Sequence, residues 1–478
     1  MDSKPLVVDL DGTLIKTDLL WETANQFSIR HPFQLFKLLV WLGHGKSTLK
    51  AHLAKFATID PALLPYNDVL LSWLQEQKKA GRRLVLATAS HSILAQLVAK
   101  HLCLFDEVLA TDDDINLKAE KKRDCLIQKY GESGFDYVGN SVDDLPIWQS
   151  AECIYVVSSS THLIKELKES GKSVHVFEDN KPSLIKSIFN ALRPYQWTKN
   201  LLIFIPLVTA HLYTDSANLM VVFFAFFIFN MTASSVYVLN DLIDITDDRL
   251  HVRKRHRVFA AGNLSLMYGW VVWPMFLVGA FLLTVFLMPL KFLIVLSTYY
   301  LLTLAYSSLL KQKPILDVLT LAALYTLRII AGAAAIPVPL SFWLLAFSMF
   351  LFTSLAFIKR FSELRLVHNS GPEMSLHGRD YSYEDLQTIS NMGTSAGYIS
   401  VLVLALYIQD VHTAQMYSSP KFIWLACPLL LYWISRAWLL AHRGNMHDDP
   451  IIFALKDKTS WIIAMCFVVI FALARIVS

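Results

Sequence analysis

Residues 240–248 read NDLIDITDD, and they continue the apolar segment 217–239 without a break. Their side-chain oxygens recur at helical spacing and so project from one face of a helix, as Asn240, Asp241, Asp244 and Asp248. Carboxylates this close repel one another unless a divalent cation lies among them, and such oxygen ligands favour Mg²⁺ bridged to substrate phosphates. The alternative is a solvated helix of mixed charge, which the adjoining apolar segment disfavours.

Basic residues follow directly and can bind the remaining phosphate charge, namely Lys254, Arg255 and Arg257.

Outward from this stretch, nine apolar segments are long enough, or nearly long enough, to cross a membrane. They are roughly 198–213, 217–239, 266–287, 291–310, 315–336, 340–359, 390–408, 421–441 and 460–477. The first is short. The fifth carries Arg328, for which a structural ion pair and a functional role are both open.

Charge divides the chain in the same way. Of the first 190 residues 46 are charged, against 36 of the remaining 288, although the net charge of the whole chain is only +4. A single soluble domain is excluded because the second part is too apolar, and disorder is excluded because 54% of the residues are hydrophobic. The net charge gives no support for nucleic-acid binding. The five scattered cysteines indicate neither disulfides nor a zinc site.

Lys and Arg are distributed unevenly over the predicted loops. With residues 1–180 on the cytosolic side, the loops on that side carry 14 of them, and the opposite loops carry two, Lys291 and Lys421. This asymmetry follows the positive-inside rule. A strand begins at Leu6, which leaves no room for a signal peptide. We therefore expect a multi-pass protein of the cell (inner) membrane with a cytoplasmic amino terminus.

Two further stretches extend the pattern around the carboxylates. Residues 193–200 read RPYQWTKN, and residues 248–262 read DRLHVRKRHRVFAAG. With the NDLIDITDD stretch, they resemble the UbiA-type membrane prenyltransferase superfamily, and within it the decaprenyl-phosphate phosphoribosyltransferase branch. The resemblance covers residues 186–478. It implies an all-α bundle of nine transmembrane helices, Mg²⁺ as cofactor, and a polyprenyl lipid and a phosphorylated sugar as substrates.

One departure bears on the reaction. Aromatic prenyltransferases of this superfamily carry a second aspartate motif at the end of span six, where this chain has Lys359, Arg360 and Glu363. A single metal cluster facing cations suits transfer of 5-phosphoribose from phosphoribosyl diphosphate to polyprenyl phosphate. The expected metal and diphosphate ligands are Asn240, Asp241, Asp244 and Asp248. The expected phosphate and substrate ligands are Arg193, Lys199, Lys254, Arg255, Arg257, Tyr306, Lys311, Lys359, Arg360 and Glu363.

The amino-terminal part carries a different pattern. Residues 7–13 read VVDLDGT, an apolar strand that ends in two aspartates. This resembles the first signature of haloacid dehalogenase-like phosphatases and implies a Rossmann-like α/β domain over residues 1–180, with a helical cap at about 17–75. Asp9 is then the nucleophile and Asp11 the general acid and base, both beside Mg²⁺.

The remaining signatures of that resemblance are less regular. Thr88 is the expected hydroxyl, with Ser90 as an alternative, and the lysine comes from Lys118, Lys121 or Lys122, of which spacing favours Lys122. Asp144 stands at the second acidic position of the last signature, but Asn140 replaces the first aspartate. Both are expected Mg²⁺ ligands with Asp9 and Asp11, although the neutral Asn140 holds the cation more weakly. Both an active phosphatase and a degenerate binding domain are therefore open. The apolar residues 33–42 are expected in the core of the cap rather than against a membrane.

The sequence as a whole favours two fused enzymes that act in succession on a polyprenyl lipid at the cytosolic face. The alternatives are an aromatic prenyltransferase that uses a prenyl diphosphate, and a membrane-tethered phosphatase whose bundle only binds lipid. The oligomeric state stays open, including a homo-oligomer.

Overall fold

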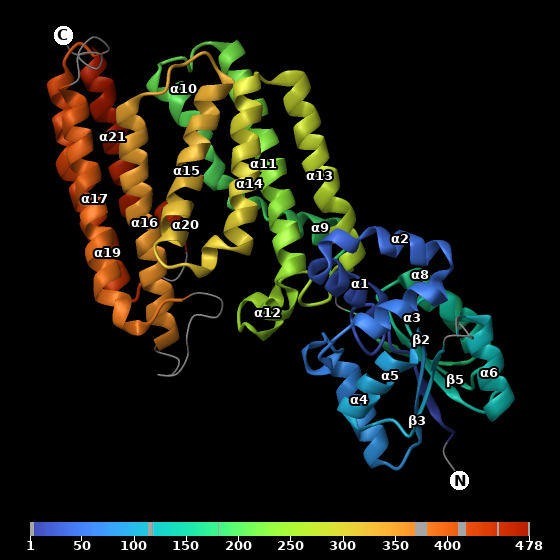
Figure 1. Cartoon of the computed structure of the whole chain (residues 1–478). Coiled ribbons are helices and arrows are strands. Elements are labelled where there is room, and N and C mark those ends of the chain that lie inside the picture. The colour runs from blue at the N-terminus through green and yellow to red at the C-terminus, as the bar shows by residue number, and fades with distance from the viewer. Residues whose placement is uncertain are drawn as a thin grey trace. The chain divides into compact units, whose positions relative to one another are not determined.

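The computed structural model describes residues 4–112, 117, 119–179, 181–368, 380–409, 417–446 and 449–476 (Figure 1). Lys118, one of the three candidate lysines, lies outside the described residues. The chain divides into two compact units. The first consists of Met1–Arg193 with Tyr237–Pro274, and the second of Pro194–Val236 with Met275–Ser478.

A six-stranded parallel sheet with the order β3-β2-β1-β4-β5-β6 forms the centre of the first unit. Its strands are β1 Leu6–Val8, β2 Leu84–His91, β3 Glu107–Thr111, β4 Asp136–Gly139, β5 Cys153–Val157 and β6 Ser173–Phe177. Every residue of β1 and β4 is buried, as expected where helices cover both faces of a parallel sheet. The predicted α/β class of the amino-terminal part is confirmed.

The helices of the first unit lie mostly between these strands. They are α1 Leu19–Arg30, α2 Phe36–Gly43, α3 Lys46–Phe56, α4 Asp68–Lys79, α5 Ser92–Leu102, α6 Glu120–Tyr130, α7 Leu145–Ser150, α8 Thr161–Glu169, α9 Leu184–Leu192 and α12 Ile245–Leu250. Helices α1 to α4 fill the segment predicted as a cap. The expectation that residues 33–42 form its core is wrong, since no residue of α2 is buried.

Among the described residues, eight helices are long and apolar enough to cross a membrane. They are α11 Ser216–Ile243, α13 Leu266–Leu287, α14 Leu290–Ser308, α15 Leu316–Ala335, α16 Phe342–His368, α17 Leu386–Ile408, α19 Ala426–His442 and α21 Lys458–Ile476. The predicted first span, residues 198–213, instead forms a 3₁₀ helix, η4 Pro194–Phe204, and the short α10 Ile205–Thr209. Lys199 and Asn200 of η4 are buried, so polar side chains of this segment lie inside the protein.

Helix α15 is the most enclosed of the eight helices. A Cβ added at Gly332 would lie 2.0 Å from the carbonyl oxygen of Ile203, so glycine allows η4 to approach the backbone of α15. The core of the second unit joins α15 to α16, α17 and α19 through residues such as Tyr325, Phe361 and Trp438. This packing brings the polar residues of η4 next to those of α15.

Candidate functional site

The first unit gathers its motif residues at the carboxyl edge of the sheet. Asp9 and Asp11 follow β1, and Asn140 follows β4, which pairs with β1 in parallel. Gly12 has a φ of +75°, and a Cβ there would lie 2.3 Å from Nδ2 of Asn140. Glycine is therefore required where the loop after β1 meets the residue that replaces the usual aspartate.

Asp9 and Lys122 form a buried ion pair at this edge. Nζ of Lys122 donates to Oδ1 of Asp9 at 2.7 Å and to the Tyr137 hydroxyl at 3.1 Å. Burial raises the pKa of Asp9 to about 7, although Lys122 opposes that rise. Burial alone would lower the pKa of Lys122, but the carboxylates of Asp9 and Asp144 hold it above its ordinary value. Of the two candidate lysines that are described, Lys122 is the one placed beside Asp9.

Asp11 contacts both hydroxyl groups that the sequence left as alternatives. Its Oδ2 accepts from Oγ of Ser90 at 2.6 Å and from Oγ1 of Thr88 at 3.2 Å, while Oδ1 accepts from the Leu19 amide at 2.8 Å. Burial, together with the charge of Asp18, raises the pKa of Asp11 to about 6. A carboxyl group with such a pKa can both release and take up a proton near neutral pH.

Asp144 is the expected partner of Asp9 for Mg²⁺, but its oxygens are already bonded. Its Oδ1 accepts from the Tyr137 hydroxyl at 2.8 Å, and Oδ2 accepts from the amides of Asn140 and Ser141 at 3.0 and 3.2 Å. Asp9 is in turn paired with Lys122. The arrangement therefore does not fit a metal ion at this edge, and no step of a reaction is derived through one.

A second cluster of the first unit lies at the end of α11. Nη1 of Arg257 donates to Oδ2 of Asp248 at 2.6 Å and to Oδ1 of Asp241 at 3.2 Å, and Arg193 pairs with Asp241 as well. Burial raises the pKa of Asp248, while Arg257 opposes the rise. Two side chains far apart in the sequence thus neutralise the carboxylates: Arg193 precedes the first apolar segment, and Arg257 follows α12.

The expectation of one continuous helical face is wrong. Helix α11 ends at Ile243, Asp244 has φ −88° and ψ 14°, and α12 begins at Ile245. Asp241 and Asp248 are nevertheless brought to the same guanidinium, whereas Asp244 is half-exposed. Lys254 and Arg255 are exposed.

The chemistry of this cluster fits Mg²⁺. Within the described residues, no three His, Cys, Asp or Glu side chains are arranged to hold a metal ion by themselves. However, Oδ1 of Asn240 and Oδ1 of Asp248 are both buried without a hydrogen-bond partner. Unpaired buried oxygens are rare because they lose their contacts with water. Mg²⁺ is commonly held by one or two protein oxygens completed by water and substrate phosphates, so this pair suits it.

Glu22 and Asn25 of α1 hold this region in place, and neither residue was predicted from the sequence. Nη2 of Arg249 donates to Oε1 of Glu22 at 2.6 Å. Asn25 donates to the carbonyl oxygen of Leu242 at 2.9 Å and accepts from the indole of Trp270 at 3.0 Å. These contacts join positions more than two hundred residues apart, which no local spacing reveals.

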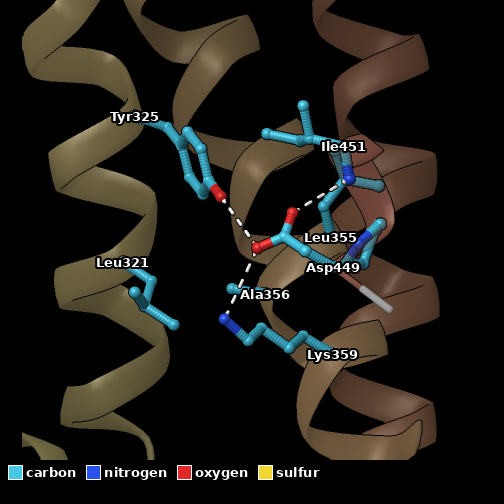
Figure 2. A pocket seen from close by; sticks show the side chains of 8 residues that line it. Leu321, Tyr325, Leu355, Ala356, Lys359, Asp449 and Ile451 are labelled. Atoms are coloured by element: carbon cyan, nitrogen blue, oxygen red, sulfur yellow. Dashed lines mark hydrogen bonds and ion pairs between the residues drawn. The ribbon is translucent and has the colours of Figure 1, made fainter. Parts of the chain in front are cut away.

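The second unit places two expected lysines on one aspartate. Nζ of Lys199 donates to Oδ2 of Asp449 at 2.6 Å, and Nζ of Lys359 does so at 3.4 Å. Figure 2 shows this carboxylate between Lys359 and the Tyr325 hydroxyl, in a small pocket that Leu321 and Leu355 also line. Burial would raise the pKa of Asp449, but the two lysines hold it below its usual range. Asp448, which precedes Asp449 in the sequence, lies outside the described residues.

Arg360 lies in a separate network. Its fully buried guanidinium pairs with Asp317 and Glu363, and it donates to the Tyr306 hydroxyl at 3.3 Å. The Tyr381 hydroxyl donates to Asp317 at 2.6 Å. These contacts supply Arg360 with acceptors from the protein itself, which supports a structural role. Lys311 is half-exposed at the end of α14.

Arg328 has no carboxylate partner among the described residues, so the ion pair that was one of the two open alternatives is absent there. Its Nε donates to Oδ1 of Asn200 at 2.7 Å, and its other nitrogens contact the carbonyl of Leu324 and the hydroxyl of Tyr299. The guanidinium also lies 5.2 Å from the ring centroid of Tyr325. Neutral acceptors and aromatic rings thus stabilise a buried cation close to the lysine pair.

Comparison with known proteins places these clusters in context. The sequence profile of the UbiA prenyltransferase family matches residues 201–462. The uncharacterized protein y4nM of Sinorhizobium fredii is 35% identical over 98% of this chain and 91% of its own length. A decaprenyl-phosphate phosphoribosyltransferase of Mycolicibacterium smegmatis is 26% identical over 62% of this chain and 96% of its own length.

Solved structures are similar to part of the chain. A UbiA homolog from Archaeoglobus fulgidus bound to GPP and Mg²⁺ superposes with a TM-score of 0.45 and 15% identity, over 60% of this chain and 99% of that chain.

Proposed function

The chain belongs to the UbiA prenyltransferase family and is a multi-pass membrane protein, and we propose that it transfers 5-phosphoribose from phosphoribosyl diphosphate to a polyprenyl phosphate. The transfer is assigned to residues 186–478. The excess of Lys and Arg on one set of loops supports a cytoplasmic amino terminus.

The observation that carries the proposal is that, within the part of the chain that the structure describes, Oδ1 of Asn240 and Oδ1 of Asp248 are each buried without a hydrogen-bond partner. With Asp244 they would hold Mg²⁺, which supplies positive charge to a leaving diphosphate when it is bound. Arg193 and Arg257 already neutralise the carboxylates in the absence of substrate. Both can turn to diphosphate oxygens, because arginine binds phosphate and carboxylate with the same fork of donors.

The two lysines that contact Asp449 in the second unit support a phosphorylated second substrate. Lys199 and Lys359 share one carboxylate, that of Asp449, and are therefore in excess over it. A lipid phosphate or the sugar 5-phosphate would supply the missing negative charge. In the reaction, an oxygen of the lipid phosphate forms a bond to the anomeric carbon, and the bond from that carbon to diphosphate breaks. The protein contributes position and charge stabilisation.

The test uses the full-length protein in vesicles with Mg²⁺, polyprenyl phosphate and labelled phosphoribosyl diphosphate. We expect label to enter the lipid, and to stop doing so in an Asp248→Asn variant. Turnover of a prenyl diphosphate with an aromatic acceptor, and none with phosphoribosyl diphosphate, would establish the aromatic prenyltransferase instead. If Asp241→Ala and Asp248→Asn left every activity intact, the helical part would only bind lipid.

A second activity is proposed for residues 1–180, as a haloacid dehalogenase-like phosphatase acting on the 5-phosphate of the lipid product. The buried pair of Asp9 and Lys122, with Asp11 bonded to Thr88 and Ser90, supports it. An oxygen of Asp9 would bond to the phosphorus while the bond to the ribose oxygen breaks, and Asp11 would protonate that oxygen. Water, deprotonated by Asp11, would then attack the phosphorus and release phosphate from Asp9. Asn140 and the occupied oxygens of Asp144 favour the alternative, a degenerate domain.

Phosphate release from the isolated lipid product separates these two possibilities. Release by the wild-type protein that is lost in Asp9→Asn supports the phosphatase. Equal release by both proteins, or none by either, supports the degenerate domain. Neither result affects the transfer, because label incorporation into lipid is measured separately.

A further inference from the structure

Helix α2 of the first unit exposes an apolar face. Phe33 in the turn before it is 95% exposed, Phe36 is 60% exposed and Leu39 is 73% exposed. They recur at three-residue spacing and so line one side of the helix. The opposite side is held by Trp41, whose ring lies against Phe27 of α1 and His52 of α3. The exposed face is therefore a fixed feature of the fold.

The sequence segment that contains this helix carries charge of one sign. Residues 23–59 contain five cations, Arg30, Lys37, Lys46, Lys50 and Lys55, and no aspartate or glutamate. The rest of the first 190 residues carries all 24 acidic residues of that part. A short apolar helix within a cationic segment is the pattern of a helix that lies in the surface of an anionic bilayer.

The same unit also contains ends of two membrane-spanning helices. Asn25 of α1 is hydrogen-bonded to the Leu242 carbonyl at the end of α11 and to Trp270 in the first turns of α13. From Asn25 to Arg30, the last residue of α1, is about 8 Å of helix. Helix α2 follows after one 3₁₀ turn, Pro32–Gln34. Helix α2 is thus joined through α1 to residues at the ends of two apolar helices.

We infer that α2 is an interfacial membrane helix, with Phe33, Phe36 and Leu39 inserted among the acyl chains of an anionic bilayer. The exposed cations that precede and follow it, Arg30 and Lys46, contact lipid phosphates, and Trp41 fixes the helix to the rest of the unit. The first unit is then held to the membrane at α2 as well as by its spans. This rests on membrane embedding and not on the proposed transfer or phosphatase activity.

The test places a photoreactive side chain on this face in the full-length protein. p-Benzoylphenylalanine replaces Leu39 in one protein and Phe33 in another. A matched control carries it at Val69 of α4, which is 66% exposed and lies in the same unit. Because all three positions are exposed, none of the replacements disturbs packing. The proteins are reconstituted into vesicles of equal parts phosphatidylcholine and phosphatidylglycerol, irradiated, and analysed by mass spectrometry for lipid adducts.

We expect about tenfold more lipid adduct at Leu39 and Phe33 than at Val69, with the yield falling when phosphatidylglycerol is left out. Adduct at Leu39 no greater than at Val69 would overturn the inference. Cross-links between two copies of the chain would overturn it as well, because they would show that the face is a subunit interface. A yield independent of phosphatidylglycerol would refute the role of the flanking cations.

Discussion

Replacing Asp449 with Asn removes a buried charge from the lysine pair of the second unit. Lys199 and Lys359 then face each other without the carboxylate that they share, and the side chain of Asp449 is only 9% exposed. Breaking a buried pair in this way costs about 3–5 kcal/mol. Asn keeps the hydrogen bond that Asp449 accepts from the Ile451 amide at 3.1 Å, so the cap of α20 (Pro450–Lys456) is preserved.

The assay is thermal unfolding of the detergent-solubilised protein. For a unit of this size each kcal/mol lowers Tm by about 2–4 °C, so we expect a loss of about 10 °C in Asp449→Asn. Asp449→Ala should lower the free energy of unfolding by about 1 kcal/mol more, because it also removes the N-cap of α20. Adding Lys199→Met to Asp449→Asn should recover part of the loss, since one of the two unpaired cations is then gone.

The pH dependence has a definite sign. The pKa of Asp449 is depressed in the folded protein, so its stabilising contribution is fully present above the ordinary aspartate range and is lost as the pH falls towards the folded value. The difference in Tm between the wild type and Asp449→Asn should therefore be constant from about pH 6 to 8 and shrink only below about pH 4.

The matched control is Asp215→Asn. Asp215 is exposed and accepts from the Ala217 amide at the start of α11, so this variant changes a charge at a cap without a buried ion pair. Its stability should stay within about 0.5 kcal/mol of the wild type. Equal Tm values for Asp449→Asn and Asp215→Asn would refute the reasoning, because the lysines would then need no buried counter-charge.

Three other predictions concern the first unit and the metal. Asp248→Asn should lower the rate of phosphoribosyl transfer by about 100-fold, as label incorporation would show. It should lower Tm less than Asp449→Asn does, because Arg257 keeps Asp241 as a partner. Removing divalent cations with EDTA should abolish transfer, and added Mg²⁺ should restore it; activity that persisted in EDTA would contradict a metal-bound diphosphate. Glu22→Gln should destabilise the protein by about 3–5 kcal/mol, because Arg249 loses a buried partner, whereas exchange of the exposed Glu169 for Gln should not.

Some of the site was predictable because it depends on short stretches of sequence. Asp9 and Asp11 follow a buried strand, and parallel strands bring their carboxyl ends to one edge, so Thr88 and Asn140 were expected nearby. Asn240 and Asp248 were likewise recognisable from spacing after an apolar segment. The break at Asp244 was not, because the sequence continues the helical pattern through it.

The partners of the charged residues could not be predicted. Lys199 and Asp449 are 250 positions apart, and Arg360 and Asp317 are 43 apart, so no local pattern links them. For the same reason, Arg360 was expected to bind phosphate although Asp317 and Glu363 already pair with it. Residues 33–42 were expected in a core because they are apolar, yet the fold leaves their outer face exposed.

Neighbouring residues are enough to show which segments are apolar, where strands and helices carry oxygen-rich motifs, and which part of the chain enters the membrane. The folded arrangement is needed to show which cations outnumber their carboxylates, which buried oxygens of the described residues lack a partner, and which apolar face is uncovered. These depend on contacts between distant segments. A charged side chain has the same sequence signature whether a carboxylate neutralises it or not.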